Sequence, residues 1–559
     1  MLFCMEIKVS VRRLVEFILV SGDIDNSKGA GLFKDAMSEG SKLHRKIQKK
    51  MGSNYRSEVP IKYSVETEKF ILTIEGRADG IITEDNEVTI DEIKGVYKNV
   101  ELMDSPIYVH QAQAMCYGFI YAMENNLDKI SIQMTYANIE TEVIKRFKEE
   151  FTLVELEKWF QEILDKYLVW ANYDYDNKIL VKSSTKGKEF PYPYRDGQRD
   201  MTASVYTAIN RKKNLFVQAP TGIGKTMAAI FPAVMALGEG HGEKIFYLTA
   251  KTITRTVAID GFNHLRECGF HIKSIALTAK EKICICEEMD CNPGNCPFAK
   301  GHYDRVNQCV YDVITHENSI TREIIIDYAM KHQVCPFEMS LDISLWVDAI
   351  ICDYNYVFDP RASLKRYFAQ GIKGEYIFFV DEAHNLVERA SSMYSAQLYK
   401  EDFLQMKKII EPLSKTLGKK LDKCNKELLA MKKECDKVNV VSGIGGFYLL
   451  LLNALSEYEK FLEEHRDIPN KKEVLDFYFQ LSNFYNIYEK CDDSYVIYTE
   501  NQGSTSFMVK LYCVHPATNL TECINKGIST IFFSATLLPI NYYKELLSNK
   551  VEDYAIYIP

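Results

Sequence analysis

The sequence lacks the long apolar segments that mark membrane proteins. No uninterrupted apolar run reaches the roughly 18 residues that a membrane-spanning helix needs, and we expect no membrane span. The opening stretch, MLFCMEIKVSVRRLVEFILVSGDIDN, mixes charges with apolar residues and has no small-residue cleavage site, so it does not resemble a secretory signal. We therefore expect a cytoplasmic protein with reduced thiols, which makes disulfides a poor explanation of its cysteines.

An excess of positive charge is also missing. The net charge is −9, so the chain as a whole is not a polycation, and any nucleic-acid contact must depend on local basic patches. The length of 559 residues exceeds what a single hydrophobic core supports and predicts several domains.

A phosphate-binding loop is predicted in NLFVQAPTGIGKTMAAI, residues 214–230. A short apolar strand over 215–218 leads into a glycine-bearing turn and then a helical pattern, in which backbone N–H groups can surround phosphates. Lys225 adds a positive charge and Thr226 a ligand for Mg²⁺. The loop residues expected to bind ATP are Ala219, Pro220, Thr221, Gly222, Ile223, Gly224, Lys225 and Thr226.

The acidic partner of this loop is predicted in EYIFFVDEAHN, residues 375–385. Five apolar residues predict a buried parallel strand that ends at Asp381 and Glu382. We expect Asp381 to hold the magnesium of ATP and Glu382 to polarise the attacking water. Both, with Lys225 and with His384 of the same DEAH sequence, are our catalytic candidates for the motor.

Three further stretches resemble motifs of superfamily 2 helicases. IFFSATL, residues 531–537, resembles the motif that couples ATP to the nucleic-acid groove, and YLTAKTITRT, residues 247–256, resembles one that contacts DNA phosphates. In YRDGQRDM, residues 194–201, Gln198 stands where these helicases recognise adenine. Five elements in the same order predict an α/β, RecA-like motor domain.

Cysteines gather between the phosphate loop and DEAH. Cys284, Cys291 and Cys296 lie in KICICEEMDCNPGNCPF, and Cys335 follows in a CPF sequence. By chemistry alone, four thiolates suit zinc or a [4Fe–4S] cluster about equally, although the paired CxxC knuckles of structural zinc sites are missing.

The position of these cysteines, followed by DYNYVFDP and DEAH, resembles the XPD/DinG family of iron–sulfur DNA helicases over roughly residues 190–559. The resemblance implies a [4Fe–4S] cluster on Cys284, Cys291, Cys296 and Cys335. Cys286 and Cys309 remain spare candidates, and the Cys-Ile-Cys pair leaves the first ligand unsettled. It also implies a helical Arch insertion and a DNA partner, single-stranded or forked, in DNA repair or replication.

A second catalytic pattern precedes the motor. FILTIEGRADGIITEDNEVTIDEIKG, residues 70–95, predicts strand, turn and strand, with Asp79 before the turn and Glu92 and Lys94 after it. Residues two apart share one face of a strand, so Glu92 and Lys94 point the same way. Two carboxylates on a divalent metal beside a lysine can activate water for phosphodiester hydrolysis. A solvated acidic hairpin is the alternative.

This pattern resembles the PD-(D/E)XK nucleases, although Asp79 lacks the usual preceding proline. GSKLH with His44, and QAMCY with Gln113 and Tyr117 on one helix face, extend the resemblance to the RecB-type branch. The resemblance implies Mg²⁺ or Mn²⁺ bound by His44, Asp79 and Glu92, with Gln113 and Tyr117 supporting the site, in a DNA exonuclease.

The expected domain order is a nuclease domain followed by an interrupted motor. The ranges are 1–178 for the nuclease, 179–193 for a linker, 194–264, 346–392 and 506–559 for the motor, 265–345 for the cluster insertion and 393–505 for the Arch. Apolar residues from Phe403 to Leu421 step by three and four, which predicts one amphipathic helix.

No Q-x-x-G-R-x-x-R motif follows DEAH, so we expect this chain to lack the second motor domain that brings the arginine finger. Either the chain is a truncated or split product, or it works with a partner chain that supplies the missing half. The chain alone would bind ATP weakly, turn it over poorly and not unwind DNA. Two alternatives remain open: an exonuclease whose motor half only grips DNA, and a non-catalytic remnant that binds single strands.

Overall fold

A computed structural model describes residues 5–25 and 36–559, apart from positions 86, 98, 140, 251, 370, 466, 467, 469, 504 and 505. The chain divides into two compact units, one of Met1–Asp23 with Ala30–Ile179 and one of Ile24–Gly29 with Leu180–Pro559. Among the described residues, no helix combines the length and apolar character that crossing a membrane requires.

The first unit is built on a six-stranded mixed sheet of order β1-β3-β4-β5-β6, with β2 paired to β3. Its strands are β1 (Met5–Ser10), β2 (Tyr55–Glu66), β3 (Phe70–Glu84), β4 (Glu87–Val96), β5 (Lys129–Asn138) and β6 (Ile144–Thr152). The hairpin of β3 and β4 confirms the strand, turn and strand expected from the sequence.

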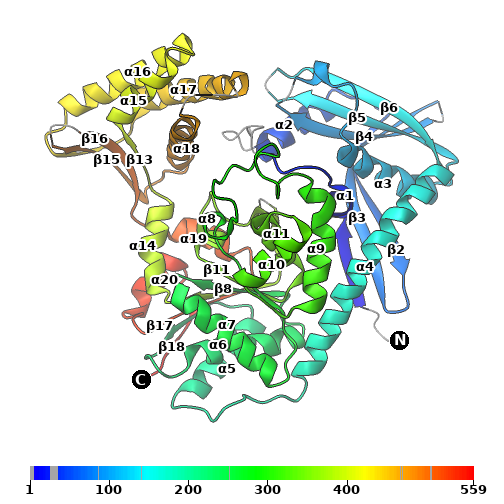
Figure 1. Cartoon of the computed structure of the whole chain (residues 1–559), viewed down its shortest axis with the longest axis vertical. Coiled ribbons are helices and arrows are strands. Elements are labelled where there is room, and N and C mark those ends of the chain that lie inside the picture. Colours follow the sequence, from blue (N-terminus) through cyan, green and yellow to red (C-terminus); the bar gives the residue numbers. More distant parts are fainter. Residues whose placement is uncertain are drawn as a thin grey trace. The chain divides into compact units, whose positions relative to one another are not determined.

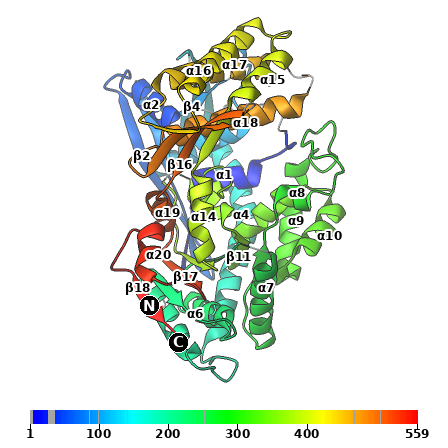
Figure 2. The same ribbon diagram turned by 90° about the vertical axis from the view of Figure 1, so that its left-hand side faces the viewer.

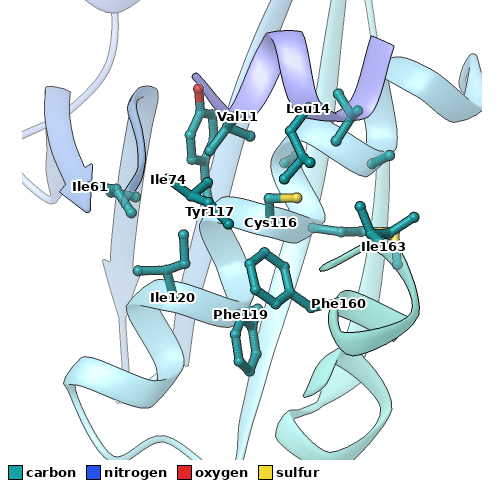
Figure 3. Close-up of a cluster of buried hydrophobic side chains, with 14 of the residues drawn as sticks. Val11, Leu14, Ile61, Ile74, Cys116, Tyr117, Phe119, Ile120, Phe160 and Ile163 are labelled. Carbon is teal, nitrogen blue, oxygen red and sulfur yellow. The ribbon is translucent and has the colours of Figure 1, made fainter. Parts of the chain in front are cut away.

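Helices cover this sheet on both faces. They are α1 (Val11–Leu19), α2 (Ala36–Gln48), α3 (Tyr108–Glu124) and the long α4 (Leu153–Thr185). The main core lies between the sheet and α1, α3 and α4, and Figure 3 shows Leu14, Cys116, Phe119 and Phe160 in it. On the opposite face, Leu43 and Ile47 of α2 pack on Ile93 of β4.

The second unit contains an eight-stranded sheet in which every strand pair is parallel. Its order is β10 (Ser319–Ile320), β9 (Ser274–Ala276), β11 (Ala349–Asp353), β8 (Lys244–Thr249), β12 (Tyr376–Asp381), β17 (Ser529–Ser534), β7 (Leu215–Gln218) and β18 (Tyr554–Tyr557). This confirms the α/β class and the buried parallel strands predicted at residues 215–218 and 376–381.

Both faces of this sheet are buried, which explains its continuous apolar strands. On one face Leu215, Ile377 and Ile531 pack in a core with residues of helices α5 (Gln198–Asn210), α6 (Lys225–Gly238) and α7 (Thr252–Glu267). Figure 1 labels these three helices beside the sheet. The other face presents Phe246 and Phe378, which meet the rings of α13 (Lys365–Phe368). The carboxyl ends of β7, β12 and β17 meet at one edge.

The cysteine-bearing segment lies between β9 and β11. It contains the short α8 (Lys280–Ile283), then α9 (His302–His316), α10 (Arg322–His332) and α11 (Pro336–Ile343). Strands β9 and β10 lie within the range expected for the insertion, 265–345, yet both belong to the eight-stranded parallel sheet. Their short length, three residues in β9 and two in β10, left no strand signal in the sequence.

A second, antiparallel sheet of order β13-β16-β15-β14 follows the DEAH strand. Its strands are β13 (Ala396–Tyr399), β14 (Val438–Val441), β15 (Tyr495–Gln502) and β16 (Ser506–Cys513), and helices α15 (Lys400–Ile410), α16 (Lys415–Lys433), α17 (Gly445–Glu464) and α18 (Lys471–Tyr488) accompany it (Figure 2). Strand β16 was expected in the motor range 506–559, but it pairs with β13 and β15.

Two local expectations are wrong. The single helix expected from Phe403 to Leu421 is two helices, because Pro412 cannot continue α15 and the Ser414 hydroxyl caps α16 by accepting the Leu417 N–H at 3.3 Å. The linker expected at 179–193 is helical as far as Thr185, since the apolar residues of α4 continue and Thr185 is buried beside Gly238.

Candidate functional sites

The phosphate loop joins β7 to α6. Gly224 precedes the helix with a φ of +80°, a conformation that favours glycine, and the helix begins at Lys225. The Lys225 ammonium donates to the carbonyls of Ala219 and Pro220 at 3.2 and 3.3 Å. The loop therefore folds around its own lysine through its carbonyl groups. The backbone N–H groups at the start of α6 remain available for phosphate.

Gln198 lies directly against this loop. Its Nε2 donates to the Gly224 carbonyl at 3.3 Å, and its Oε1 accepts the Arg195 N–H at 3.1 Å. The Arg195 guanidinium donates to the Gly222 carbonyl. A Cβ atom on Gly224 would lie 2.6 Å from Gln198 Nε2, so a larger residue there would have to displace the Gln198 side chain.

The two magnesium candidates are linked by a tyrosine. The buried hydroxyl of Tyr247 on β8 donates to Asp381 Oδ2 at 3.2 Å and is hydrogen-bonded to Thr226. Burial raises the pKa of Asp381 to about 6, and the neighbouring charge of Glu382 adds to this, while the Tyr247 bond opposes it. Thr226 and Asp381 thus converge where a hydrated magnesium ion would bind.

The DEAH strand and the SAT sequence form one hydrogen-bonded network. The Ser534 hydroxyl lies 3.0 Å from Glu382 Oε2 and 2.7 Å from His384 Nδ1. Gln218, at the end of β7, donates to the Ala535 carbonyl at 2.6 Å and accepts the Leu537 N–H at 2.5 Å. A change at the phosphate loop can therefore reach the SAT sequence through Gln218 and Ser534.

Glu382 occupies an unusual backbone conformation, with a φ of +50°. The Tyr354 hydroxyl donates to the carbonyls of Asp381 and Glu382, the latter at 3.1 Å, and stabilises this turn. The turn directs the Glu382 carboxylate towards Ser534 and His384 rather than along the strand.

Five cysteines line one pocket in the second unit. They are Cys284, Cys286, Cys291, Cys296 and Cys335. Cys286 and Cys296 have their sulfur atoms 3.7 Å apart. The rest of the lining consists of the apolar residues Ile24, Ile285, Phe298, Ala299, Pro336 and Phe337 together with the charged residues Lys280 and Glu338. The spare candidate Cys309 is not part of this lining; it is buried beside Met339.

Cys335 stands at the start of α11. Burial raises the pKa of its thiol to about 11, although hydrogen bonds from the backbone N–H groups of Glu338 and Phe337 act in the opposite direction. His302 accepts the Cys335 N–H through Nδ1 at 3.1 Å. Metal binding would stabilise the thiolate that burial disfavours.

In the first unit, Asp79 lies where β3 and β4 separate. Their ladder ends at the pair Gly80–Asp91, and the Asp79 carboxylate accepts the Ile93 N–H at 2.8 Å. His44 of α2 lies with Nδ1 3.6 Å from Asp79 Oδ1. Beyond the end of the ladder, the Ile93 N–H of β4 is therefore bonded to the side chain of Asp79 and not to the main chain of β3.

Glu92 and Lys94 share the face of β4 that meets α3. Lys94 Nζ lies 2.8 Å from Glu92 Oε1 and donates to Gln113 Oε1 at 3.0 Å, and Gln113 donates to the Tyr117 hydroxyl at 3.3 Å. Glu92 is 2 % exposed, and its Oε2 has no hydrogen-bond partner among the described residues. Burial raises its pKa to about 8, with Lys94 opposing.

Asp91 points to the other face, where Thr135, Gln133 and Tyr55 bond to it. Within the described part of the chain, no three His, Cys, Asp or Glu side chains are arranged so that they could hold a metal ion as they stand. The donor chemistry still fits, since an orphaned carboxylate oxygen beside a second carboxylate and an imidazole suits Mg²⁺ or Mn²⁺, and thiols in an apolar pocket suit iron–sulfur or zinc.

Some contributors were missed from the sequence. Tyr247 and Gln218 lie in otherwise apolar strands, so a polar group there was the available sign of a functional role. The sequence offered no such sign for Arg195 or Ile24. The contact of Tyr247 depends on the order of β8 and β12 in the sheet, which spacing along the chain does not specify.

Two family models match the chain over overlapping ranges. The DEAD/DEAH box helicase family matches residues 199–292, and the family described as DEAD_2 matches residues 251–403. The ranges include the phosphate loop, the cysteine pocket and the DEAH strand.

Curated relatives are helicases that share part of the chain. The chain is 25% identical over 280 residues to human regulator of telomere elongation helicase 1, and 24% over 272 residues to its Caenorhabditis elegans homolog. These cover 40% and 41% of this chain but 22% and 26% of those proteins. A probable ATP-dependent helicase of Methanocaldococcus jannaschii is 27% identical over 200 residues, covering 30% of this chain and 29% of that protein. The chain thus spans about a quarter of each relative's length.

Solved structures of XPD are similar at lower identity. An XPD helicase structure gives a TM-score of 0.44 at 16% identity, covering 65% of this chain and 62% of its own, and a truncated XPD gives 0.42 at 17%, covering 64% and 98%. The similarity to helicase families thus extends over residues 199–403, the part of the chain that contains the phosphate loop and the DEAH strand.

Proposed function

We propose that the second unit is the ATP-driven motor of an XPD/DinG-type DNA helicase that acts in DNA repair or replication. One observation carries this proposal: Thr226, in the first turn of α6, and Asp381, at the end of β12, share the hydroxyl of Tyr247. A chance glycine-rich turn would have no reason to share a buried tyrosine hydroxyl with a carboxylate at the end of another strand.

In this motor, N–H groups of the loop and Lys225 bind the phosphates of ATP, and Gln198 contacts the base. Thr226 and Asp381 would hold magnesium, which neutralises developing charge on the phosphates. Glu382 orients the attacking water and, through Ser534, reports the state of the phosphate to the SAT sequence. Movement of that sequence would transmit ATP binding to the DNA groove.

Nucleotide binding by the purified chain tests the motor. With a fluorescent ATP analogue and Mg²⁺, the wild type should bind and Lys225→Ala should lose at least about tenfold in affinity, because a charge-assisted contact to phosphate disappears. Lys213→Ala, an exposed lysine just before β7, is the matched control and should bind like wild type. Equal affinity in wild type and Lys225→Ala would exclude this ATP site.

We propose a [4Fe–4S] cluster in the cysteine pocket. Cys291, Cys296 and Cys335 would be three ligands, and either Cys284 or Cys286 the fourth, in a small domain beside the path of single-stranded or forked DNA. The helices α15–α18 with their antiparallel sheet would be the Arch over that path. The apolar lining supports a cluster shielded from water.

Anaerobic purification with iron and sulfide analysis tests the cluster. We expect four iron and four sulfide per chain in wild type, with broad absorbance near 400 nm. Cys335→Ser should lose most of both, while the buried Cys309→Ala should keep them. Stoichiometric zinc in a colourless protein would refute the cluster.

A second activity is favoured by Glu92. A carboxylate this buried, with one oxygen unpartnered and a lysine at 2.8 Å, is costly unless a cation completes it. We propose a RecB-like DNA exonuclease in which Asp79, Glu92 and His44 would hold Mg²⁺ or Mn²⁺, which lowers the pKa of bound water. Lys94 would then stabilise charge on the scissile phosphate, with Gln113 and Tyr117 fixing its position.

Degradation of labelled DNA with Mn²⁺ tests this site. Asp79→Asn and Glu92→Gln should each reduce it by about 100-fold or more. Glu142→Gln, which removes an exposed partner of Lys46, is the control. Degradation should survive Lys225→Ala, and its survival in Glu92→Gln would exclude Glu92 as a ligand.

A further inference from the structure

Of the described residues among the first 180, Ile24 alone lines the cysteine pocket. Its side chain is 7 % exposed, and its N–H donates to the Ala299 carbonyl at 2.9 Å. By its contacts it belongs to the second unit, although the chain before it and the chain from Ala30 onward belong to the first.

The bond to Ala299 fixes Ile24 to the turn that carries a proposed cluster ligand. Ala299 donates its own N–H to the Cys296 carbonyl at 3.1 Å. Ile24, Phe298 and Ala299 then form an adjoining apolar part of the lining. Without the Ile24 side chain, that part would depend on residues 298 and 299 alone.

We propose that Ile24 is a wall of the cofactor pocket, so that retention of the cluster depends on a residue far upstream of every cysteine ligand. The inference rests on the cluster proposed above. An apolar side chain at this place keeps water and dissolved oxygen from the inorganic sulfides, and the apolar shell of a metal site controls solvent access and redox potential.

The proposal requires an apolar side chain of this size at position 24, and three substitutions of Ile24 test that requirement. Ile24→Leu keeps an aliphatic side chain of equal size, Ile24→Ala opens the pocket on one side, and Ile24→Asp places a carboxylate against thiolates and a cluster of negative charge. The main-chain bond to Ala299 remains in all three. Met289, 49 % exposed in the same cysteine segment and outside the pocket lining, offers the matched control Met289→Ala.

The experiment uses full-length chains purified anaerobically. Iron and sulfide are measured first, then the decay of absorbance near 400 nm after exposure to air, together with circular dichroism to show that each variant is folded. We expect decay about tenfold faster in Ile24→Ala and faster still, or a lower iron content from the start, in Ile24→Asp. Ile24→Leu and Met289→Ala should decay like wild type.

The possible outcomes distinguish the proposed role of Ile24 from the presence of the cluster itself. A wild-type chain without iron and sulfide overturns both. A wild type with cluster, and Ile24→Ala and Ile24→Asp that are folded and lose it no faster, overturns the wall alone. Equal acceleration in Met289→Ala also overturns it, because any change in the segment would then have the same effect. Should Ile24→Asp not fold, the comparison of Ile24→Ala with Ile24→Leu decides.

Discussion

Replacing Glu92 by glutamine should stabilise the metal-free first unit at alkaline pH. The pKa of Glu92 is raised by burial from 4.5 to about 8. A folded-state pKa above the unfolded value means that the folded protein binds the proton more tightly. Stability is therefore fully present below pH 4.5 and is lost as the pH rises towards 8.

The size of the effect follows from that shift. It corresponds to about 5 kcal/mol for complete ionisation, of which about 3 kcal/mol is lost between pH 5 and pH 8. Glutamine keeps the shape and carries no charge to bury. The difference in unfolding free energy between Glu92→Gln and wild type should thus grow by about 3 kcal/mol over this range.

Tryptophan emission during urea unfolding can report this unit alone. In a Trp346→Phe background the two remaining tryptophans, Trp159 and Trp170, both lie on α4 within the first unit. Adding Mn²⁺ at pH 8 should recover stability in the wild type and not in Glu92→Gln. Parallel pH profiles for the two proteins would refute both the burial argument and the use of Glu92 as a ligand.

Three further predictions concern the second unit. Gly224→Ala should lower ATP affinity by at least about tenfold, from a positive φ and the contact with Gln198, whereas Gly240→Ala, which has the same φ of +80° and no atom within 4 Å, should bind ATP normally. Tyr247→Phe removes a hydrogen bond that lowers the pKa of Asp381, so a titration at several pH values should show Mg²⁺-dependent ATP affinity reduced about fivefold and its midpoint moved above pH 6; an unchanged midpoint would contradict the bridge. Phe403→Ala should destabilise the helices around it by about 3–5 kcal/mol in urea unfolding, since this buried ring contacts Phe447 and Phe477, while the partly exposed Leu404→Ala should cost much less.

Two strands of the parallel sheet were predictable because they are continuously apolar and bounded by motifs. The strand before the phosphate loop and the strand before Asp381 needed only a continuous apolar pattern to be recognised. The apolar pattern gave a wrong prediction where individual residues end one helix and begin another although the apolar spacing continues. Pro412 and Ser414 divide a helix whose apolar spacing continues across the break.

The residue types that make up the candidate sites could be predicted from the sequence, but the contacts between those residues could not. Glu92 and Lys94 follow from the alternation of side chains along a strand. The unpartnered Glu92 oxygen, the bridge made by Tyr247 and the place of Ile24 depend on which segments pack together over long sequence distances. Such contacts leave no periodic trace in one sequence.

The parallel sheet also bears on how the chain is synthesised. Strand β7, which leads to the phosphate loop, is held between β17 and β18, with Leu215 beside Ile531 and Tyr554. A ribosome must therefore add more than three hundred residues before β7 gains its neighbours. During that interval the strand remains an exposed apolar edge, so we expect slow, late closure of the nucleotide site and a dependence on chaperones in the cell.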